Sequence, residues 1–130
     1  MTTMRMLFSG AAILAAIAVR GAEQPAAKWT ELQRRDIPGT GREGVTMAIE
    51  IPPGATSARH SHPGEDFGYL IEGTIVLQVD GKPPVTVKAG EVFFTERGHI
   101  HNARNIGTTT ARALDTYIID KGKPVITPAQ

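Results

Sequence analysis

The chain has 130 residues, of which 41% are apolar, and its 14 basic side chains nearly balance 13 acidic ones. This length and apolar content predict a single domain that folds without covalent cross-links. Because the chain contains no cysteine, thiolate metal ligands and cysteine nucleophiles are excluded, so any metal must be bound by nitrogen and oxygen atoms. No basic run of the kind that follows a phosphate backbone is present, and we expect no nucleic-acid partner.

The N-terminal stretch has the composition of a secretory signal peptide. Its first six residues carry one cation, Arg5, and residues 7–19 form an uncharged run rich in Ala, Ile and Leu. This run is shorter than the stretch of about 20 residues that a transmembrane helix needs, which makes a permanent anchor the weaker interpretation. We therefore expect residues 1–21 to be a signal peptide, and the mature protein to be secreted or periplasmic, without stable membrane insertion.

The next segment, residues 22–44, has the composition of an N-terminal extension or linker. Within it, residues 29–35 fit either a turn of helix or a first strand, and the sequence Ile37-Pro38-Gly39 ends this short element. From Val45 to Ile51 the pattern changes, because apolar residues alternate with Thr, Ala and Glu. That alternation is typical of a half-buried strand.

Short β-rich runs separated by glycine and proline turns fill the rest of the chain. The expected later strands cover residues 67–71, 74–79, 85–87, 92–95 and 111–119. The first two are expected to pair as a hairpin, and Asp80-Gly81 predicts a second hairpin after them. Short strands with little helical periodicity predict an all-β sandwich or barrel over residues 45–120, followed by a C-terminal tail at 121–130.

All four histidines of the chain fall in two His-x-His pairs, His60 with His62 and His99 with His101. Side chains two residues apart share one face of a strand, so a pair can point into one interior, where a third imidazole from a distant strand can meet it. Three imidazoles with a nearby carboxylate are typical of a site for a first-row transition metal. The sequence therefore predicts a metal centre inside a β-barrel.

The first histidine segment resembles the first sequence motif of the cupins. That motif runs from a glycine through five residues to His-x-His, then through three or four residues to a glutamate, and after six more residues to a glycine. In this chain Gly54, His60, His62 and Gly73 stand in register, and Asp66 takes the place of the glutamate.

The second histidine segment is similar to the second cupin motif. Gly90, Gly98, His101 and Asn105 are in register with that motif, and Glu96 stands where the motif has proline. Together with the flanking strands, the resemblance covers roughly residues 45–119. The replacement of the motif proline by Glu96 affects a turn and does not change a metal ligand.

The resemblance implies a single-domain jelly-roll β-barrel in which His60, His62 and His101 hold a divalent transition metal, Fe, Mn, Ni, Cu or Zn. The carboxylate of the first motif is commonly a fourth ligand, but Asp66 is one methylene shorter than glutamate. We therefore rank Asp66 first, as a ligand or near-ligand that also serves as a proton acceptor. A site of three histidines alone ranks second, and Glu65 ranks third because it should face the other side of a regular strand.

Two further polar residues near the motifs have simpler interpretations. His99 lies outside the ligand pattern, and it is expected either to contribute to the pocket or to be exposed. Asn105 is expected to form a turn through side-chain bonds to its own backbone.

For function, the resemblance implies an exported metal-dependent enzyme, with dioxygenase-like oxidation of a small oxygenated organic molecule as the first expectation. Isomerase, lyase and decarboxylase chemistry also occur in the family. A cupin that binds a metal or small ligand without turnover is the alternative, because no acid–base pair stands out beyond the metal ligands. Edge strands of an open sandwich are usually covered and members of the family commonly pair, so we expect a homodimer.

Overall fold

The structure is a computed structural model that describes residues 26–130. These residues form ten strands: β1 (Lys28–Ile37), β2 (Arg42–Ile51), β3 (His60–Ser61), β4 (Gly64–Glu72), β5 (Thr74–Val79), β6 (Val85–Lys88), β7 (Val92–Thr95), β8 (His101–Asn105), β9 (Ala111–Asp120) and β10 (Thr127–Pro128). Within the described part of the chain, no helix has the length and apolar character needed to cross a bilayer. The signal peptide predicted for residues 1–21 lies outside the described residues.

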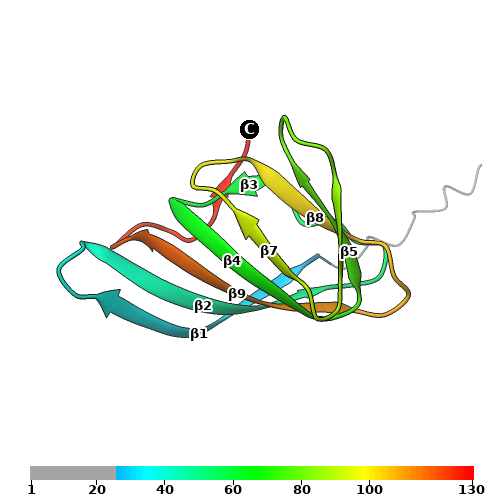
Figure 1. Cartoon of the computed structure of the whole chain (residues 1–130), viewed down its shortest axis with the longest axis horizontal. Coiled ribbons are helices and arrows are strands. Elements are labelled where there is room, and N and C mark those ends of the chain that lie inside the picture. Colours follow the sequence, from blue (N-terminus) through cyan, green and yellow to red (C-terminus); the bar gives the residue numbers. More distant parts are fainter. Residues whose placement is uncertain (1–25) are drawn as a thin grey trace, which may run out of the picture.

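The strands form two antiparallel sheets that enclose a common interior (Figure 1). The first sheet has the order β1-β2-β9-β4-β7, and the second has the order β10-β3-β8-β5-β6. Most neighbours in both sheets come from distant parts of the sequence, as β2 and β9 do, whereas β1 with β2 and β5 with β6 are consecutive. The expected all-β jelly-roll architecture is confirmed.

Alternation of buried and exposed residues along the long strands creates the interior. The core consists of two apolar clusters, one of Ile49, Ile51, Ala55, Leu70, Ile75, Val87, Ala111 and Ala113 and the other of Val45, Tyr117, Ile119 and Val125. Burying each Val, Leu or Ile side chain contributes roughly 1.5–3 kcal/mol, so these clusters hold the sheets together.

Residues 22–44, predicted from the sequence to be an N-terminal extension or linker, contain β1, a strand of the first sheet. β1 pairs with β2 along its length, with Trp29 opposite Ile49 and Ile37 opposite Arg42, and β2 starts three residues before the predicted Val45. The period-two signal was weak because β1 is an edge strand whose side chains are mostly exposed and polar.

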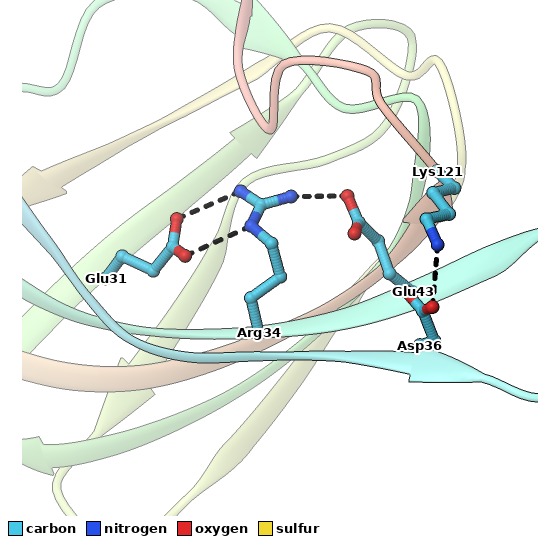
Figure 2. Close-up of polar contacts among 5 residues, drawn as sticks. All are labelled: Glu31, Arg34, Asp36, Glu43 and Lys121. Carbon is cyan, nitrogen blue, oxygen red and sulfur yellow. Dashed lines mark hydrogen bonds and ion pairs between the residues drawn. The ribbon is translucent and has the colours of Figure 1, made fainter.

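Ion pairs fasten this edge strand to the residues beside it (Figure 2). Arg34 donates two hydrogen bonds to Glu31, from Nε to Oε1 at 3.0 Å and from Nη2 to Oε2 at 2.9 Å, and its third nitrogen pairs with Glu43 of β2. Farther along β1, Lys121 Nζ lies 2.6 Å from Asp36 Oδ2. Solvent screens the exposed pairs, whereas Glu43 is only 4% exposed, so its contact with the Arg34 guanidinium supplies a partner for a buried carboxyl group.

The predicted hairpin between residues 67–71 and 74–79 is wrong. β4 lies in the first sheet between β9 and β7, whereas β5 lies in the second sheet between β8 and β6. The chain crosses from one sheet to the other at Gly73, whose φ of 89° and close approach to Ala111 leave no room for a side chain. The second predicted hairpin, between β5 and β6, is confirmed.

The C-terminal segment is also part of the fold, although the sequence described residues 121–130 as a tail. β10 pairs with β3, with Thr127 opposite Ser61, and Val125 is buried in the second apolar cluster. This packing brings the C-terminal backbone to the strand that carries the first histidine pair.

Candidate metal centre

Three histidines meet in the barrel interior because strands β3 and β8 pair with His60 opposite His101. His62 follows β3 directly and returns to the same interior face. The three side chains are almost completely buried, and one ring nitrogen from each lies within 4.8 Å of the others. The predicted convergence of His60, His62 and His101 is therefore observed.

Backbone carbonyls hold all three rings in one tautomer. The Nδ1 atoms of His60, His62 and His101 lie 2.6, 2.7 and 2.9 Å from the carbonyl oxygens of Ala58, Val125 and His99, respectively. A carbonyl oxygen only accepts hydrogen bonds, so each Nδ1 carries the proton and each Nε2 presents a lone pair. Second partners of this kind are usual for histidines that bind metals.

The arrangement of the lone pairs fits a shared metal ion. His62 Nε2 and His101 Nε2 are 3.2 Å apart, and neither has a proton to donate to the other in this tautomer. Two nitrogens that each bind one ion at about 2.0–2.1 Å are separated by roughly this distance. The donor set, three neutral imidazoles without sulfur, suits a first-row transition metal.

Burial also keeps the rings neutral. It lowers the pKa of His62 to about 3 and that of His101 to about 4, and it lowers the pKa of His60, in each case because the charged ring loses water. Neutral imidazoles are the form that binds metal, so these histidines are available as ligands at neutral pH.

Asp66 faces the same interior and lies next to the three histidines, but its carboxyl oxygens are not among the converging ligand atoms. Its Oδ2 atom lies 3.9 Å from His62 Nε2, beyond hydrogen-bonding distance, and the side chain is 2% exposed. Among the described residues, the group whose ligand atoms converge contains the three histidines and not this carboxylate. Ligation by Asp66 stays a prediction, and the observed cluster is the three-histidine set that ranked second.

The other two candidates lie elsewhere. Glu65 is half-buried and pairs with Arg42, whose hydrogen bond lowers the pKa of this carboxyl, so it is directed away from the histidines. The His99 side chain is 39% exposed and lies 3.3 Å from Glu96, so the exposed alternative is observed. His99 contributes through its backbone carbonyl, which holds the ring of His101.

A second buried carboxyl, Asp115, was missed by the sequence reasoning. In the pairing of β4 with β9, Asp66 is opposite Tyr117 and Gly68 is opposite Asp115, which puts both carboxyls on the inner face. The Tyr117 hydroxyl donates to Asp115 Oδ2 at 3.2 Å. The inward alternation of residues 111–119 was the signal that could have found Asp115.

Desolvation makes both carboxyl groups weaker acids than usual. Burial raises the pKa of Asp115 to about 7. Burial raises the pKa of Asp66 well above its usual range, and the adjoining Asp115 raises it further. The interior thus contains an acidic pair beside neutral imidazoles.

A cavity opens next to these groups. It is lined by Trp29, Ile49, Ile51, Ser57, His60, Asp66, Ile75, Leu77, Phe93, His101, Ala103, Ala113, Asp115 and Tyr117, and it offers about 400 Å³ of space, its mouth included. Two aromatic rings frame the histidines, with Tyr117 centred 4.5 Å from His62 and Trp29 edge-on to His60 at 6.0 Å. A mostly apolar cavity with a few convergent polar groups is typical of a small-molecule site.

Comparison with known sequences agrees with this geometry. Residues 47–117, more than half of the chain, match the sequence pattern of the cupin domain. The chain belongs to the cupin family. The resemblance stated from the two histidine motifs is thereby confirmed, and the fold of this cupin matches it.

Individual relatives of this cupin include proteins named for oxalate. It is 36% identical to the oxalate-binding protein of Thermotoga maritima over 72 residues, which are 55% of this chain and 59% of that protein. It is 33% identical to oxalate oxidase GF-2.8 of Triticum aestivum over 97 residues, which cover 68% of this chain and 43% of the relative. The chain thus spans about half the length of these curated relatives.

A solved structure supports the fold over a larger share of the chain. An uncharacterized conserved protein with a double-stranded β-helix domain from Klebsiella pneumoniae superposes with a TM-score of 0.67, covering 83% of this chain and 88% of that one. The two sequences are 19% identical, so the likeness concerns the fold alone.

Proposed function

We propose that this cupin is a metal-dependent enzyme that oxidises a small oxygenated organic molecule by dioxygenase-like chemistry. The observation that carries the proposal is the convergence of three buried, proton-free Nε2 atoms beside a cavity. A divalent transition metal held by His60, His62 and His101 would supply Lewis acidity and open coordination positions for the substrate. Fe, Mn, Ni, Cu and Zn all suit this donor set.

The chain's own residues prepare the site for such chemistry. Backbone carbonyls orient the histidines, so little reorganisation accompanies metal binding. Asp66 lies close enough to His62 to tune the centre or to accept a proton from a bound substrate. Apolar side chains form most of the cavity wall beside these groups.

A second candidate function is binding without turnover. The relative named as an oxalate-binding protein favours it, whereas the relative named as an oxalate oxidase favours oxidation. Isomerase, lyase or decarboxylase chemistry at the same centre is a further alternative, because a metal acting as a Lewis acid serves these reactions as well.

Metal analysis followed by oxygen measurements separates these candidates. The protein is purified without added metal, its metal content is determined, and oxygen uptake is recorded with oxalate, diketones, flavonols and small thiols. We expect about one metal ion per chain and oxygen consumption with one substrate class. Stoichiometric metal without consumption of any compound would support the binding function, and the absence of metal would contradict both proposals.

We also propose that the protein is exported, because residues 1–21 have the composition of a signal peptide. Cell fractionation and N-terminal sequencing of the mature protein test this point. A full-length chain recovered from the cytoplasm would contradict it.

A further inference from the structure

Most polar side chains on the cavity wall are engaged with one another. The Trp29 indole lies within hydrogen-bonding reach of the Tyr117 hydroxyl, and that hydroxyl donates to Asp115. Asp115 is hydrogen-bonded in turn to Asp66. The two histidines of the wall give their Nδ1 protons to backbone carbonyls and keep Nε2 for the metal. Among the described residues that line the cavity, Ser57 is the one polar side chain outside these contacts.

Ser57 is fixed to strand β8 by two hydrogen bonds to one residue. Its backbone N–H donates to the Ala103 carbonyl at 2.8 Å, and its Oγ accepts from the Ala103 N–H at 2.9 Å. A serine hydroxyl also has one proton to donate, and within residues 26–130 the structure gives that proton no acceptor. Ser57 is 4% exposed, and a buried donor without an acceptor costs about 1–3 kcal/mol. A ligand that brings an acceptor oxygen to Ser57 removes this cost.

The register of the second sheet places Ser57 close to the metal ligands. His60 is opposite His101, and the next inward residue of β8 is Ala103, to which Ser57 is bonded. Successive inward positions of a strand are about 7 Å apart, so Ser57 lies one such step from the histidine pair along the same wall. Ala103 is opposite Leu77 in the pairing of β5 with β8, and both are apolar. The Ser57 hydroxyl is therefore the polar group on this part of the wall.

These positions limit the length and the chemistry of the ligand. A metal–oxygen bond of about 2 Å and a hydrogen bond of about 2.8 Å take up part of the step between the two groups, which leaves room for a skeleton of a few carbon atoms. A carboxylate suits the metal end, because the cation attracts its charge. The Ser57 end needs an oxygen that accepts a hydrogen bond, and the apolar wall between the two favours a hydrocarbon skeleton.

We propose that Ser57 binds the substrate by donating a hydrogen bond from its Oγ to a carbonyl oxygen of a molecule whose carboxylate is held by the metal. The ligand class is accordingly a short-chain oxo acid. This inference rests on the proposed function, because the metal holds the other end of the ligand. It assigns Ser57 to substrate positioning, separate from the histidines and from the carboxyl pair.

Two acids that share a skeleton and a carboxylate test the contact. Levulinate carries a ketone oxygen where 4-methylpentanoate carries a methyl group. The protein is loaded with Ni²⁺, and both affinities are measured by titration calorimetry in the wild type and in Ser57→Ala. We expect Ser57→Ala to lower the ratio of levulinate affinity to 4-methylpentanoate affinity about tenfold, the loss of one hydrogen bond, while the affinity for 4-methylpentanoate stays unchanged.

Two further variants assign the effect to the hydroxyl group. Ser57→Thr keeps a hydroxyl at this position, so it should keep the wild-type ratio. Thr56→Ala removes an exposed hydroxyl from the neighbouring residue and is the matched control, which should also keep the ratio. A purely structural role of Ser57 would weaken the binding of both acids alike in Ser57→Ala, because the Ala103 N–H then loses its acceptor.

A spectroscopic measurement on the wild type decides the matter even if Ser57→Ala does not fold. Levulinate labelled with ¹³C at the ketone carbon has an isolated carbonyl stretching band, and a hydrogen bond to the oxygen lowers the frequency of that band. We expect the band of bound levulinate near the frequency that it has in water. A band at the higher frequency found in a hydrocarbon solvent would overturn the proposed contact.

The outcomes separate this inference from the function on which it rests. An unchanged affinity ratio in Ser57→Ala, or a Ni²⁺-loaded wild type that binds neither acid, would overturn the role of Ser57 while metal binding stays intact. A wild type that takes up no Ni²⁺ would instead contradict the proposed function, and this inference with it.

Discussion

The orientation of each imidazole is set by one hydrogen bond to the backbone. His60 and His101 bond to the carbonyl two residues earlier in the chain, which makes these contacts local, whereas His62 bonds to Val125, which is distant in the sequence. At the residue scale the centre therefore depends on two local contacts and one contact that exists only in the folded barrel.

Replacing one histidine should remove the metal and spare the fold. In His62→Ala or His101→Ala, two imidazoles remain and metal content should fall at least tenfold, because a ligand is lost. The apolar clusters are untouched, so the β-sheet circular dichroism should persist. His99→Ala is the control, because its side chain lies at the surface beside Glu96; full metal occupancy in His62→Ala would contradict the ligand assignment.

Lengthening Asp66 tests whether its carboxylate reaches the metal. Asp66→Glu adds one methylene to a side chain whose Oδ2 now lies 3.9 Å from His62 Nε2. We expect metal affinity to be preserved or increased, measured by competition with a chelator of known affinity. Loss of metal from this variant would argue that the carboxylate is not a ligand.

The pH dependence of the metal-free protein contains opposing contributions from the histidines and the acidic pair. The pKa of His62 is lowered to about 3, so the folded protein resists protonation of this ring. The associated stability is present above pH 6.5 and is lost as the pH falls toward 3. The pKa of Asp115 is raised to about 7, so the folded protein favours the protonated carboxyl group. The associated stability is present below pH 3.8 and is lost as the pH rises toward 7. In the range between pH 4 and 6.5 the two contributions partly cancel.

Removing Asp115 should therefore make the metal-free protein more sensitive to acid. In Asp115→Asn one of the two carboxyls that offset the histidine contribution is gone, so the free energy of unfolding should fall more steeply between pH 6.5 and 4 than in the wild type. The difference in slope is at most about 1.4 kcal/mol per pH unit for one titrating group. Urea unfolding with a chelator present measures it, and equal slopes in the two proteins would be inconsistent with a raised pKa at Asp115.

At the scale of elements, the C-terminal segment connects the barrel to the metal centre. β10 pairs with β3, and the Val125 carbonyl just before it holds His62 Nδ1 at 2.7 Å. The strand closes the second sheet at its edge beside β3, where Figure 1 shows the C-terminus. A short segment thus affects both sheet pairing and ligand orientation.

Two truncations distinguish these roles. A chain that ends after Ile126 loses β10 but keeps Val125, whereas a chain that ends after Pro124 loses both. We expect the shorter chain to bind metal about 10–100-fold more weakly, since His62 then lacks the partner that orients it. The chain that ends after Ile126 should lose far less affinity, and equal metal affinities for the two chains would show that the Val125 carbonyl does not matter.

At the scale of the whole molecule, the first sheet exposes an apolar outer face. Its exposed side chains lie on β4, β7 and β9 and comprise Phe67, Tyr69, Ile71, Val92, Phe94 and Leu114. β7 is the edge strand beside them, and Val92 on it is 75% exposed. Large apolar groups gathered at a sheet edge are typical of an interaction surface.

This face supports the prediction that the protein is a homodimer. Sedimentation velocity of the wild type should give twice the mass of one chain, because a second copy can cover the apolar face. Val92→Asp and Phe94→Asp should shift the protein to the monomer, while Val85→Asp on the edge strand of the other sheet should not. A wild type that sediments as a monomer at all concentrations would contradict the prediction.

The sequence by itself identified His60, His62 and His101 as candidate ligands, because a ligand motif is a matter of residue type and spacing along the chain. The alternation of β2 and β9 likewise predicted an all-β barrel, since period two is a local property. The sequence left residues 29–35 undecided between a turn of helix and a first strand, and placed them in an extension, because edge strands bury few side chains and the weak pattern there resembles that of a linker.

Only the tertiary structure decided which distant groups meet. Strand order and register decide that β4 and β5 belong to different sheets and that Val125 contacts His62. They also put Asp66 of β4 and Asp115 of β9 on the same inner face. Strand order and register are set by burying the two apolar clusters as a whole, so the spacing of residues within any one segment does not reveal them.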